Sequence, residues 1–319
     1  SDDEEEEEEE EEDEVEEEKD ELTKQMDMED AALATIIRLR QEKSNQKKNA
    51  KSLMRTARAF QLRVLALIER FIVYATSSST ASPLAFTLSS HLLAALRVAS
   101  LASGQGGEVI ALRDRLRSIY KKLVSAKHIC KAQDLDVEEA QVQTKELCNL
   151  ALTRHVKFLP DLDNLASSGL MFLFRVLAAN KNCVMSAESI TDAYAPILDD
   201  LIAKKKGKIS KPKILQDVIT RHPSAGSCLS NLLIEYCVSV EGDRVKPRTL
   251  FQRHLCVVLL TSLVKHSPNT FSLKSSCECF VKLCKTNPFQ KKQHIKTLMS
   301  LGQVLIRTAR SRNGKVTDE

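Results

Sequence analysis

The sequence predicts an all-α protein, an irregular armadillo- or HEAT-like helical solenoid preceded by a disordered acidic segment. The 319 residues include only nine glycines and eight prolines, and 4% are aromatic. Apolar residues recur at helical spacing in segments of about 14–22 residues, which polar or proline-containing breaks separate. Two successive segments occupy about 40–47 residues, the period of armadillo and HEAT units. No run of alternating apolar and polar residues requires a sheet.

The charge of the chain is separated along its length. Residues 1–30 contain 21 Asp and Glu against two Lys, whereas the other 289 residues contain 45 Lys and Arg against 22 Asp and Glu. Residues 1–25 repel one another and contain little to bury, so we expect them to be disordered at neutral pH. This separation favours a polyanionic partner for the basic body and a basic partner for the acidic segment.

Apolar stripes mark the first helices. An amphipathic segment starts at Asp27, with acidic side chains in its first turn. One face of a long helix follows over Phe60–Phe71 and ends near the polar cluster Thr76–Thr80. Further stripes over Leu84–Leu96 and Leu112–Leu123 predict the next two helices.

The same pattern continues to residue 310. Later stripes run over Cys228–Val240, Leu255–Leu263 and Ile295–Leu305. Breaks are expected near Gln133–Asp136, Pro160, Asn180–Ser186, Gly207–Pro212, Pro223, Gly242–Pro247, Pro268 and Pro288. The sequence therefore predicts a disordered segment over residues 1–25, a solenoid over 26–310 and a disordered tail over 311–319.

The cysteines, the apolar runs and the start of the chain indicate the redox compartment, the absence of a membrane partner and a longer parent protein. Nine cysteines cannot all pair internally, and most lie in apolar helical patterns, so we expect free thiols in a reducing compartment. No apolar run approaches the roughly 20 residues that span a bilayer, so we expect no membrane partner. Because the chain begins at Ser1 and enters the acidic run at once, we expect a fragment of a longer protein.

Patterns that carry catalysis are missing from the sequence. Nucleotidyl transfer needs two or three carboxylates around paired metal ions. Here the acidic residues are concentrated near the N-terminus, and neighbours such as Asp199 and Asp200 are interpreted as exposed helix charges. We find no P-loop, dinucleotide-binding glycine pattern, nucleophile elbow or metalloprotease His-Glu pair. We therefore expect a non-enzymatic protein without a cofactor.

Three cysteines near the C-terminus are candidate zinc ligands. Cys277, Cys279 and Cys284 lie close in sequence, with His266 or His294 nearby. Their spacing matches no familiar zinc module, and residues two apart on a helix point to different sides. Structural thiols are the favoured interpretation, and no metal is expected.

Lysine and arginine runs are the candidate binding residues. One run lies in a predicted loop around Gly207, another at a helix end before residue 128, and a third on the last helix. Distributed basic side chains bind phosphates by releasing counterions, and few aromatic residues are present for base stacking. The candidate nucleic-acid contacts are Lys121, Lys122, Lys127, Lys204, Lys205, Lys206, Lys208, Lys211, Lys213, Lys291, Lys292, Arg307, Arg310 and Arg312. The alternative is a solvated basic face.

Residues 1–128 resemble the Myb-binding protein 1A family, also called the DNA polymerase phi family. The resemblance lies in an acidic run followed by Met28-Glu-Asp-Ala-Ala-Leu-Ala-Thr-Ile-Ile-Arg38-Leu-Arg40, then Phe60-Gln-Leu-Arg63-Val-Leu-Ala-Leu-Ile-Glu69-Arg-Phe, then Ser82-Pro-Leu84 opening a leucine-rich helix. It implies a nucleolar protein that supports ribosomal RNA synthesis and large-subunit maturation, in some lineages also as a transcriptional co-regulator. It also implies that this chain is the C-terminal part, beginning in the acidic linker.

These observations predict a nucleolar, non-enzymatic scaffold. It would contact ribosomal RNA or rDNA chromatin through basic helix ends and basic proteins through the acidic segment. Pre-ribosomal or transcription-factor proteins are further expected partners. The alternative is a transcription co-regulator or other protein-protein adaptor that does not bind nucleic acid. A template-copying enzyme is disfavoured because the two-metal carboxylates are missing.

Overall fold

The computed structural model describes most of the chain. Its described residues are 3–77, 84–101, 107–126, 136–153, 157–179, 185–202, 212–238, 247–286, 289 and 291–316. The chain divides into two units, residues 1–61 and residues 62–319.

The first unit consists of the N-terminal part of one long helix, α1 (Asp3–Ser77, 75 residues). Residues 1–77 contain neither glycine nor proline, and Glu, Lys, Arg and Ala are strong helix formers. Every residue from Met28 to Ala57 is exposed. This part of α1 therefore owes its helical form to local propensity rather than to burial within the unit.

This helix differs from the sequence-based expectation. Residues 1–25 were expected to be disordered, and Asp27 was expected to open a separate segment, but α1 begins at Asp3 and continues through both. The physical reason is that a glutamate run has high helix propensity and no residue that breaks the helix. Like charges four residues apart oppose that propensity. Helix propensity favours an ordered helix in residues 1–25, and charge repulsion favours disorder. That these residues are disordered at neutral pH stays a prediction.

The second unit contains the end of α1 and eleven further helices. No strand occurs among its described residues. In chain order the helices are α2 (Leu84–Leu101), α3 (Gly107–Ser125), α4 (Val137–Ala151), α5 (Leu162–Ala179), α6 (Ala187–Ile202), α7 (Lys213–Arg221), α8 (Pro223–Ser227), α9 (Ser230–Val238), α10 (Pro247–His266), α11 (Leu273–Thr286) and α12 (Lys292–Val316).

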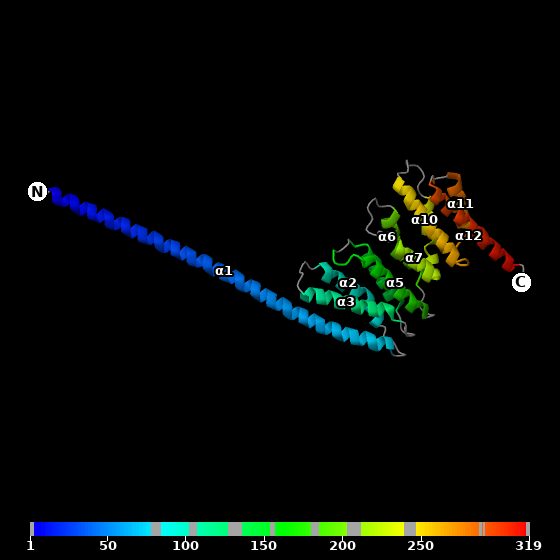
Figure 1. Cartoon of the computed structure of the whole chain (residues 1–319), viewed down its shortest axis with the longest axis horizontal. Helices are drawn as coiled ribbons and strands as arrows, with labels where there is room; N and C mark the ends of the chain where they lie inside the picture. The colour runs from blue at the N-terminus through cyan, green and yellow to red at the C-terminus, as the bar shows by residue number, and fades with distance from the viewer. Residues whose placement is uncertain are drawn as a thin grey trace. The chain divides into compact units, whose positions relative to one another are not determined.

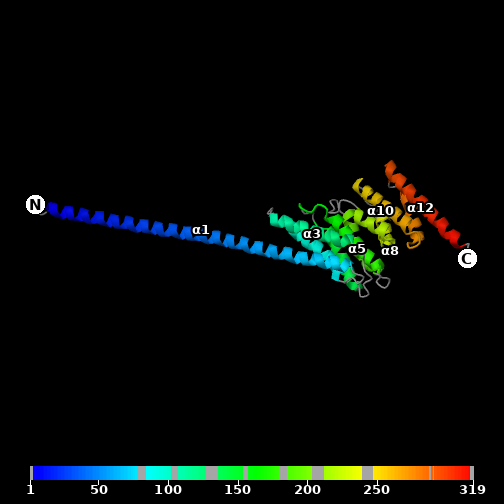
Figure 2. The ribbon, with the colours of Figure 1, turned by 60° about the horizontal axis from the view of Figure 1, so that its bottom comes forward.

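These helices stack in two layers. Layer 1 contains residues 62–77 of α1 followed by α3, α5, α7, α10 and α12, and from α3 onward each helix packs on the next member of its layer. Layer 2 contains α2, α4, α6, α9 and α11, which contact one another in the same order. Figure 1 shows α3, α5, α7, α10 and α12 in sequence from green to red, and Figure 2 shows α3, α5, α10 and α12 in the same order from another side. The predicted all-α, solenoid-like fold is confirmed.

Hydrogen bonds between successive helices of layer 1 show the repeat. Arg175 of α5 donates to the Val124 carbonyl at the end of α3, 2.6 Å away and 51 positions earlier. Ser267 donates to the Pro223 carbonyl over 3.0 Å and 44 positions. Arg312 donates through Nε to the Pro268 carbonyl over 2.8 Å, again across 44 positions. These bonds tie α5 to the end of α3, the residue after α10 to the start of α8, and α12 to the turn after α10, at the near-constant separations of a repeat protein.

The hydrophobic core runs through the second unit between the layers. The largest fully buried side chains come from both layers and include Leu93, Leu96, Ile119, Tyr120, Leu147, Leu170, Leu173, Tyr194 and Ile197. Breaks between the helices fall close to the predicted positions, because proline, glycine and polar clusters end helices locally. The expected tail of residues 311–319 is helical as far as Val316.

Candidate nucleic-acid interface

The last helix, α12, carries the strongest positive charge of the solenoid. Its 25 residues contain six Lys and Arg and no Asp or Glu. One side, with His294, Leu298 and Leu301, is buried, and the helix packs on α10 and α11. The opposite side presents Lys292, Lys296, Arg307 and Arg310 to solvent. The helical period thus places four of its basic side chains away from the core.

A glycine sets how closely α12 approaches α11. A Cβ atom at Gly302 would lie 2.6 Å from Cζ of Phe280 on α11. A Cβ at this position would therefore push against the end of the Phe280 ring unless that ring shifted.

Arg312 holds the C-terminal part of α12 in place. Its guanidinium donates to the carbonyls of Pro268 and Phe271 and lies 5.0 Å from the centroid of the Phe271 ring. The sequence assigned Arg312 to nucleic-acid contact, whereas here it caps the turn between α10 and α11. Part of its hydrogen-bonding capacity is therefore used within the fold and is not available to a phosphate.

Two histidines stack at the N-terminal end of α12. The rings of His254 and His294 lie 4.1 Å apart, and His254 shares a 2.9 Å hydrogen bond with Thr297. Burial lowers the pKa of both histidines, reinforced by His294 at His254 and by Lys291 at His294. We therefore take both rings as neutral at pH 7 and assign the charge of this end to Lys291, Lys292 and Lys296.

Lysines of α3 lie on a different part of the solenoid. Lys122 and Arg115 both form ion pairs with Glu69 of α1, and the Lys122 hydrogen bond lowers the pKa of Glu69. Lys121 is exposed. Because α5, α7 and α10 separate α3 from α12 in layer 1, these predicted contacts do not form one patch with those of α12.

The remaining predicted contacts are only partly placed. Lys213 is exposed at the start of α7, and Lys291 is exposed just before α12. The predicted contacts Lys127, Lys204, Lys205, Lys206, Lys208 and Lys211 lie outside the described residues.

Charge is also sorted between the two layers. The helix sequences of layer 1, from residue 62 onward, contain 19 Lys and Arg against five Asp and Glu. Those of layer 2 contain five Lys and Arg against nine Asp and Glu. This sorting cannot be seen along the sequence, because helices of the two layers alternate. It makes layer 1 the better surface for a polyanion.

A further basic segment, not among the predicted contacts, lies in α1. Residues 38–58 contain eight Lys and Arg against one acidic residue, Glu42. Arg40, Lys43 and Lys47 follow one another at spacings of three and four, so they share one side of the helix, and all three are exposed. A count of charge in windows of about 20 residues would have found this segment.

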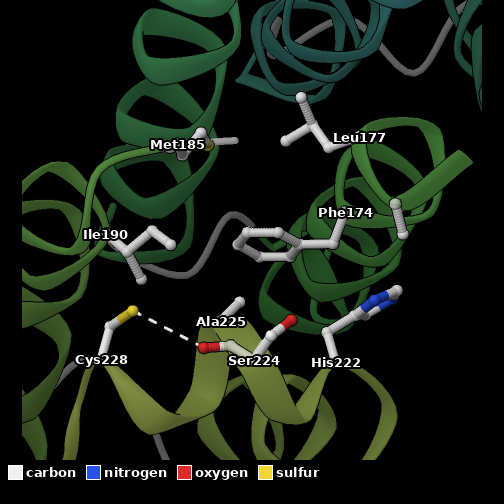
Figure 3. A pocket seen from close by; sticks show the side chains of 9 residues that line it. Phe174, Leu177, Met185, Ile190, His222, Ser224, Ala225 and Cys228 are labelled. Carbon is white, nitrogen blue, oxygen red and sulfur yellow. Dashed lines mark hydrogen bonds between the residues drawn. The ribbon is translucent and has the colours of Figure 1, made fainter. Parts of the chain in front are cut away.

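Figure 3 shows a cavity of about 190 Å³ between α5, α6 and the turn from α7 to α9. The Phe174 ring points into it, with Met185 and Ile190 on one side and His222 on the other. The Cys228 thiol donates to the Ser224 carbonyl over 3.6 Å, and burial raises its pKa. Burial also lowers the pKa of His222. A protonated thiol bonded to a carbonyl is not an activated nucleophile.

The cysteines considered for zinc lie in different environments. Cys279 is buried, Cys277 is partly buried and Cys284 is exposed. No group of three or more metal-ligating side chains converges among the described residues. Cys279 instead lies beside Cys237 of α9, and a hydrogen bond between these thiols together with burial raises the pKa of Cys279. The tertiary structure therefore groups Cys279 with a residue far away in sequence.

Two helices qualify as membrane spans by length and composition. These are α2 and α5, each of 18 residues, with 50% and 67% of their residues buried in the fold. No apolar run of this length was expected from the sequence. Core helices of soluble proteins share this composition, so the observation is weak evidence for a span.

No family model matches the sequence, and no curated protein or solved structure shows significant similarity to it. The resemblance to the Myb-binding protein 1A family therefore stays a prediction from the motifs of the first 128 residues.

Proposed function

We propose that this chain is a non-enzymatic nucleic-acid-binding scaffold that works in the nucleolus. It binds ribosomal RNA or rDNA chromatin, supports ribosomal RNA synthesis and large-subunit biogenesis, and engages basic proteins through its acidic segment. The observation that carries the proposal is α12, a 25-residue helix with six basic residues and no acidic residue. The nucleolar part of the proposal comes from the family resemblance.

The exposed side of α12 suits a phosphate backbone better than bases. Lys292, Lys296 and Arg310 lie on one side over several turns, so each can meet a different phosphate of a duplex or folded RNA. No exposed aromatic residue lies on this side of α12 to stack on a base. Binding is therefore expected to depend strongly on salt and weakly on sequence.

Titrating RNA binding with salt tests this function. The variant K292A/K296A/R310A removes three charges from α12, and K145A/K274A/K285A removes three exposed lysines from layer 2. Each lost phosphate contact lowers the slope of log K against log[salt] by about 0.7–0.9. We expect the α12 variant to lower the slope by about 2 and the layer 2 variant to leave it nearly unchanged.

Two results contradict the proposal. One is RNA binding by the unmodified chain that does not respond to salt. The other is an equal loss in both variants, which would mean that net charge rather than α12 governs binding.

Removing residues 1–25 in parallel measures whether the acidic segment competes with RNA for the basic surface. Cross-linking of the tagged chain to RNA in cells would then identify the bound segment.

A second function, a protein-protein adaptor, is favoured by apolar residues on the same side of α12. Met299 and Ile306 are 59% and 56% exposed, and Ile295 lies one turn before Met299. Exposed apolar side chains on one side of a helix suit a further packing partner. The variant M299S/I306S separates the two functions, because an adaptor loses its protein partner while RNA binding persists.

A further inference from the structure

The positive charge of layer 1 is concentrated at the C-terminal ends of its helices. The last eight residues of α3, α5, α7, α10 and α12 contain eight Lys and Arg and one acidic residue, Asp217. The first eight residues of the same helices contain six Lys and Arg and four Asp and Glu. We define the C-terminal edge by one basic residue from each of these helices: Lys121, Arg175, Arg221, Lys265 and Arg312.

Arg175 and Arg221 bring the ends of α3, α5 and α7 together. The Arg175 guanidinium donates to the Val124 carbonyl at the end of α3 over 2.6 Å, and its Nε has no hydrogen-bond partner among the described residues. Burial lowers the pKa of Arg175, and the positive charge of Arg221 lowers it further. Burial and the same two arginines also lower the pKa of His222. An ion pair of 3.5 Å between Arg221 and Asp217 offsets part of this charge.

Hydrogen bonds to backbone carbonyls carry the C-terminal edge on to α10 and α12. The Ser267 hydroxyl, one residue after α10, donates over 3.0 Å to the Pro223 carbonyl, which lies just beyond the end of α7. Lys265, two residues before Ser267, is exposed. Arg312 of α12 donates to the Pro268 carbonyl over 2.8 Å. The basic ends of five helices that are far apart in sequence therefore follow one another along the stack.

Helix dipoles alone do not explain this row of charge. Basic residues near the C-terminus of a helix complement its dipole, and this preference applies to every helix. The last eight residues of the layer 2 helices α2, α4, α6, α9 and α11, however, contain four Lys and Arg and four Asp and Glu. The excess at the C-terminal edge is thus a property of layer 1, and it suits an extended polyanion.

We propose that a nucleic-acid duplex lies along the C-terminal edge of layer 1. The exposed side chains of Lys121, Arg221 and Lys265 contact its phosphates directly. Arg175 and Arg312, whose guanidinium groups are partly used within the fold, add positive charge behind them. The inference rests on the proposed function and adds a second contact surface to the exposed side of α12.

The dimensions and the side chains of the edge favour a duplex over a single strand. Packed helices lie about 8–10 Å apart, so five successive ends span about 32–40 Å. One turn of a DNA duplex is about 34 Å long, so the edge can follow a duplex over a full turn. The aromatic residues in these helix ends, Tyr120, Phe172 and Phe174, are all buried. They cannot stack on an unpaired base.

Salt titration of duplex binding to the full chain tests the C-terminal edge. The probes are an RNA duplex about two turns long, the DNA duplex of the same sequence, and one unpaired strand of each. The variant K121A/R221A/K265A removes the three exposed contacts and keeps Arg175 and Arg312, which hold helices together. Each lost duplex contact lowers the slope of log K against log[salt] by about 0.9, so we expect a fall of about 2–3.

A matched control removes the same charge elsewhere. Lys145 and Lys285 are exposed on layer 2, and Lys213 is exposed at the opposite end of α7. We expect K145A/K213A/K285A to leave the slope nearly unchanged. Circular dichroism and thermal unfolding of both variants report whether the fold is kept. A fall confined to the RNA duplex or to the DNA duplex supports the proposal and identifies the bound nucleic acid.

Three outcomes overturn the proposal. The first is an edge variant that keeps the slope of the unmodified chain on both duplexes; if K292A/K296A/R310A still lowers the slope, the edge fails and the proposed function stands. The second is an unpaired strand that binds as tightly as the duplexes and loses as much in the edge variant. The third is duplex binding by the unmodified chain that does not respond to salt, which overturns the proposed function as well.

Discussion

Single side chains decide how closely the helices of the solenoid approach one another. Tyr120 of α3 donates a 2.7 Å hydrogen bond to the Leu165 carbonyl on α5 and is fully buried. A Cβ atom at Gly169, one turn further along α5, would lie 2.5 Å from the Tyr120 hydroxyl and 3.1 Å from Leu147 of α4. Glycine here is a packing requirement, although glycine normally weakens a helix.

Gly169→Ala should therefore destabilise the protein. In an open helix position the change would stabilise by up to about 1 kcal/mol, but overpacking a core typically costs about 1–3 kcal/mol, so the clash wins. The measurement is the free energy of unfolding by urea. Gly107→Ala is the matched control, because nothing lies within 4 Å of the Cβ it would add. Equal stability of the two variants would contradict the packing argument.

At the scale of elements, α1 belongs to both units, and its last part packs within the second unit. Leu65, Ile72 and Ala75 are buried in the core. Glu69 lies between them in sequence and pairs with Arg115 and Lys122 of α3. The apolar contacts supply the attachment, and the ion pairs orient the helix against α3.

Glu69→Gln should loosen the end of α1 without unfolding the other helices. The pKa of Glu69 is lowered by the Lys122 hydrogen bond, so its carboxylate contributes stability that is present at neutral pH and lost on acidification. We expect faster amide hydrogen exchange over residues 65–75 and in α3. The conservative change Asp192→Asn, at an exposed position of α6, is the control. Unchanged amide hydrogen exchange in both variants would show that Glu69 does not orient α1 against α3.

At the scale of the whole second unit, each helix contacts only near neighbours in the stack. The layer order means that α2 and α12 are connected through intermediate helices rather than directly. Stability in such proteins is close to a sum of local and nearest-neighbour contributions. A destabilising substitution in one helix should then affect mainly the helices next to it.

Leu301→Ala and Leu93→Ala test this locality at the two ends. Both leucines are fully buried, Leu301 in α12 and Leu93 in α2, and such truncations cost about 2–5 kcal/mol. We expect Leu301→Ala to reduce hydrogen-exchange protection mainly in α10 to α12, and Leu93→Ala mainly in α2 to α5. A uniform loss across the unit in either variant would show that it unfolds as one cooperative block.

Much of the fold could be predicted because its signals are local. Stripes such as Leu84–Leu96 and breaks such as Pro268 act within a few residues, and the helices begin and end close to them. Less of the candidate site could be predicted. Lys122 and Arg312 looked equivalent to Lys292, yet they are engaged by Glu69 and by the Pro268 carbonyl.

The sequence by itself determined the helical class, the approximate helix boundaries and the separation of acidic and basic segments, since these depend on neighbouring residues. Only the tertiary structure decided which basic side chains remain exposed and which layer carries the positive charge. Contacts such as Arg312 with Pro268 join residues 44 positions apart. Such pairs meet only when successive helices stack, so no local pattern encodes them.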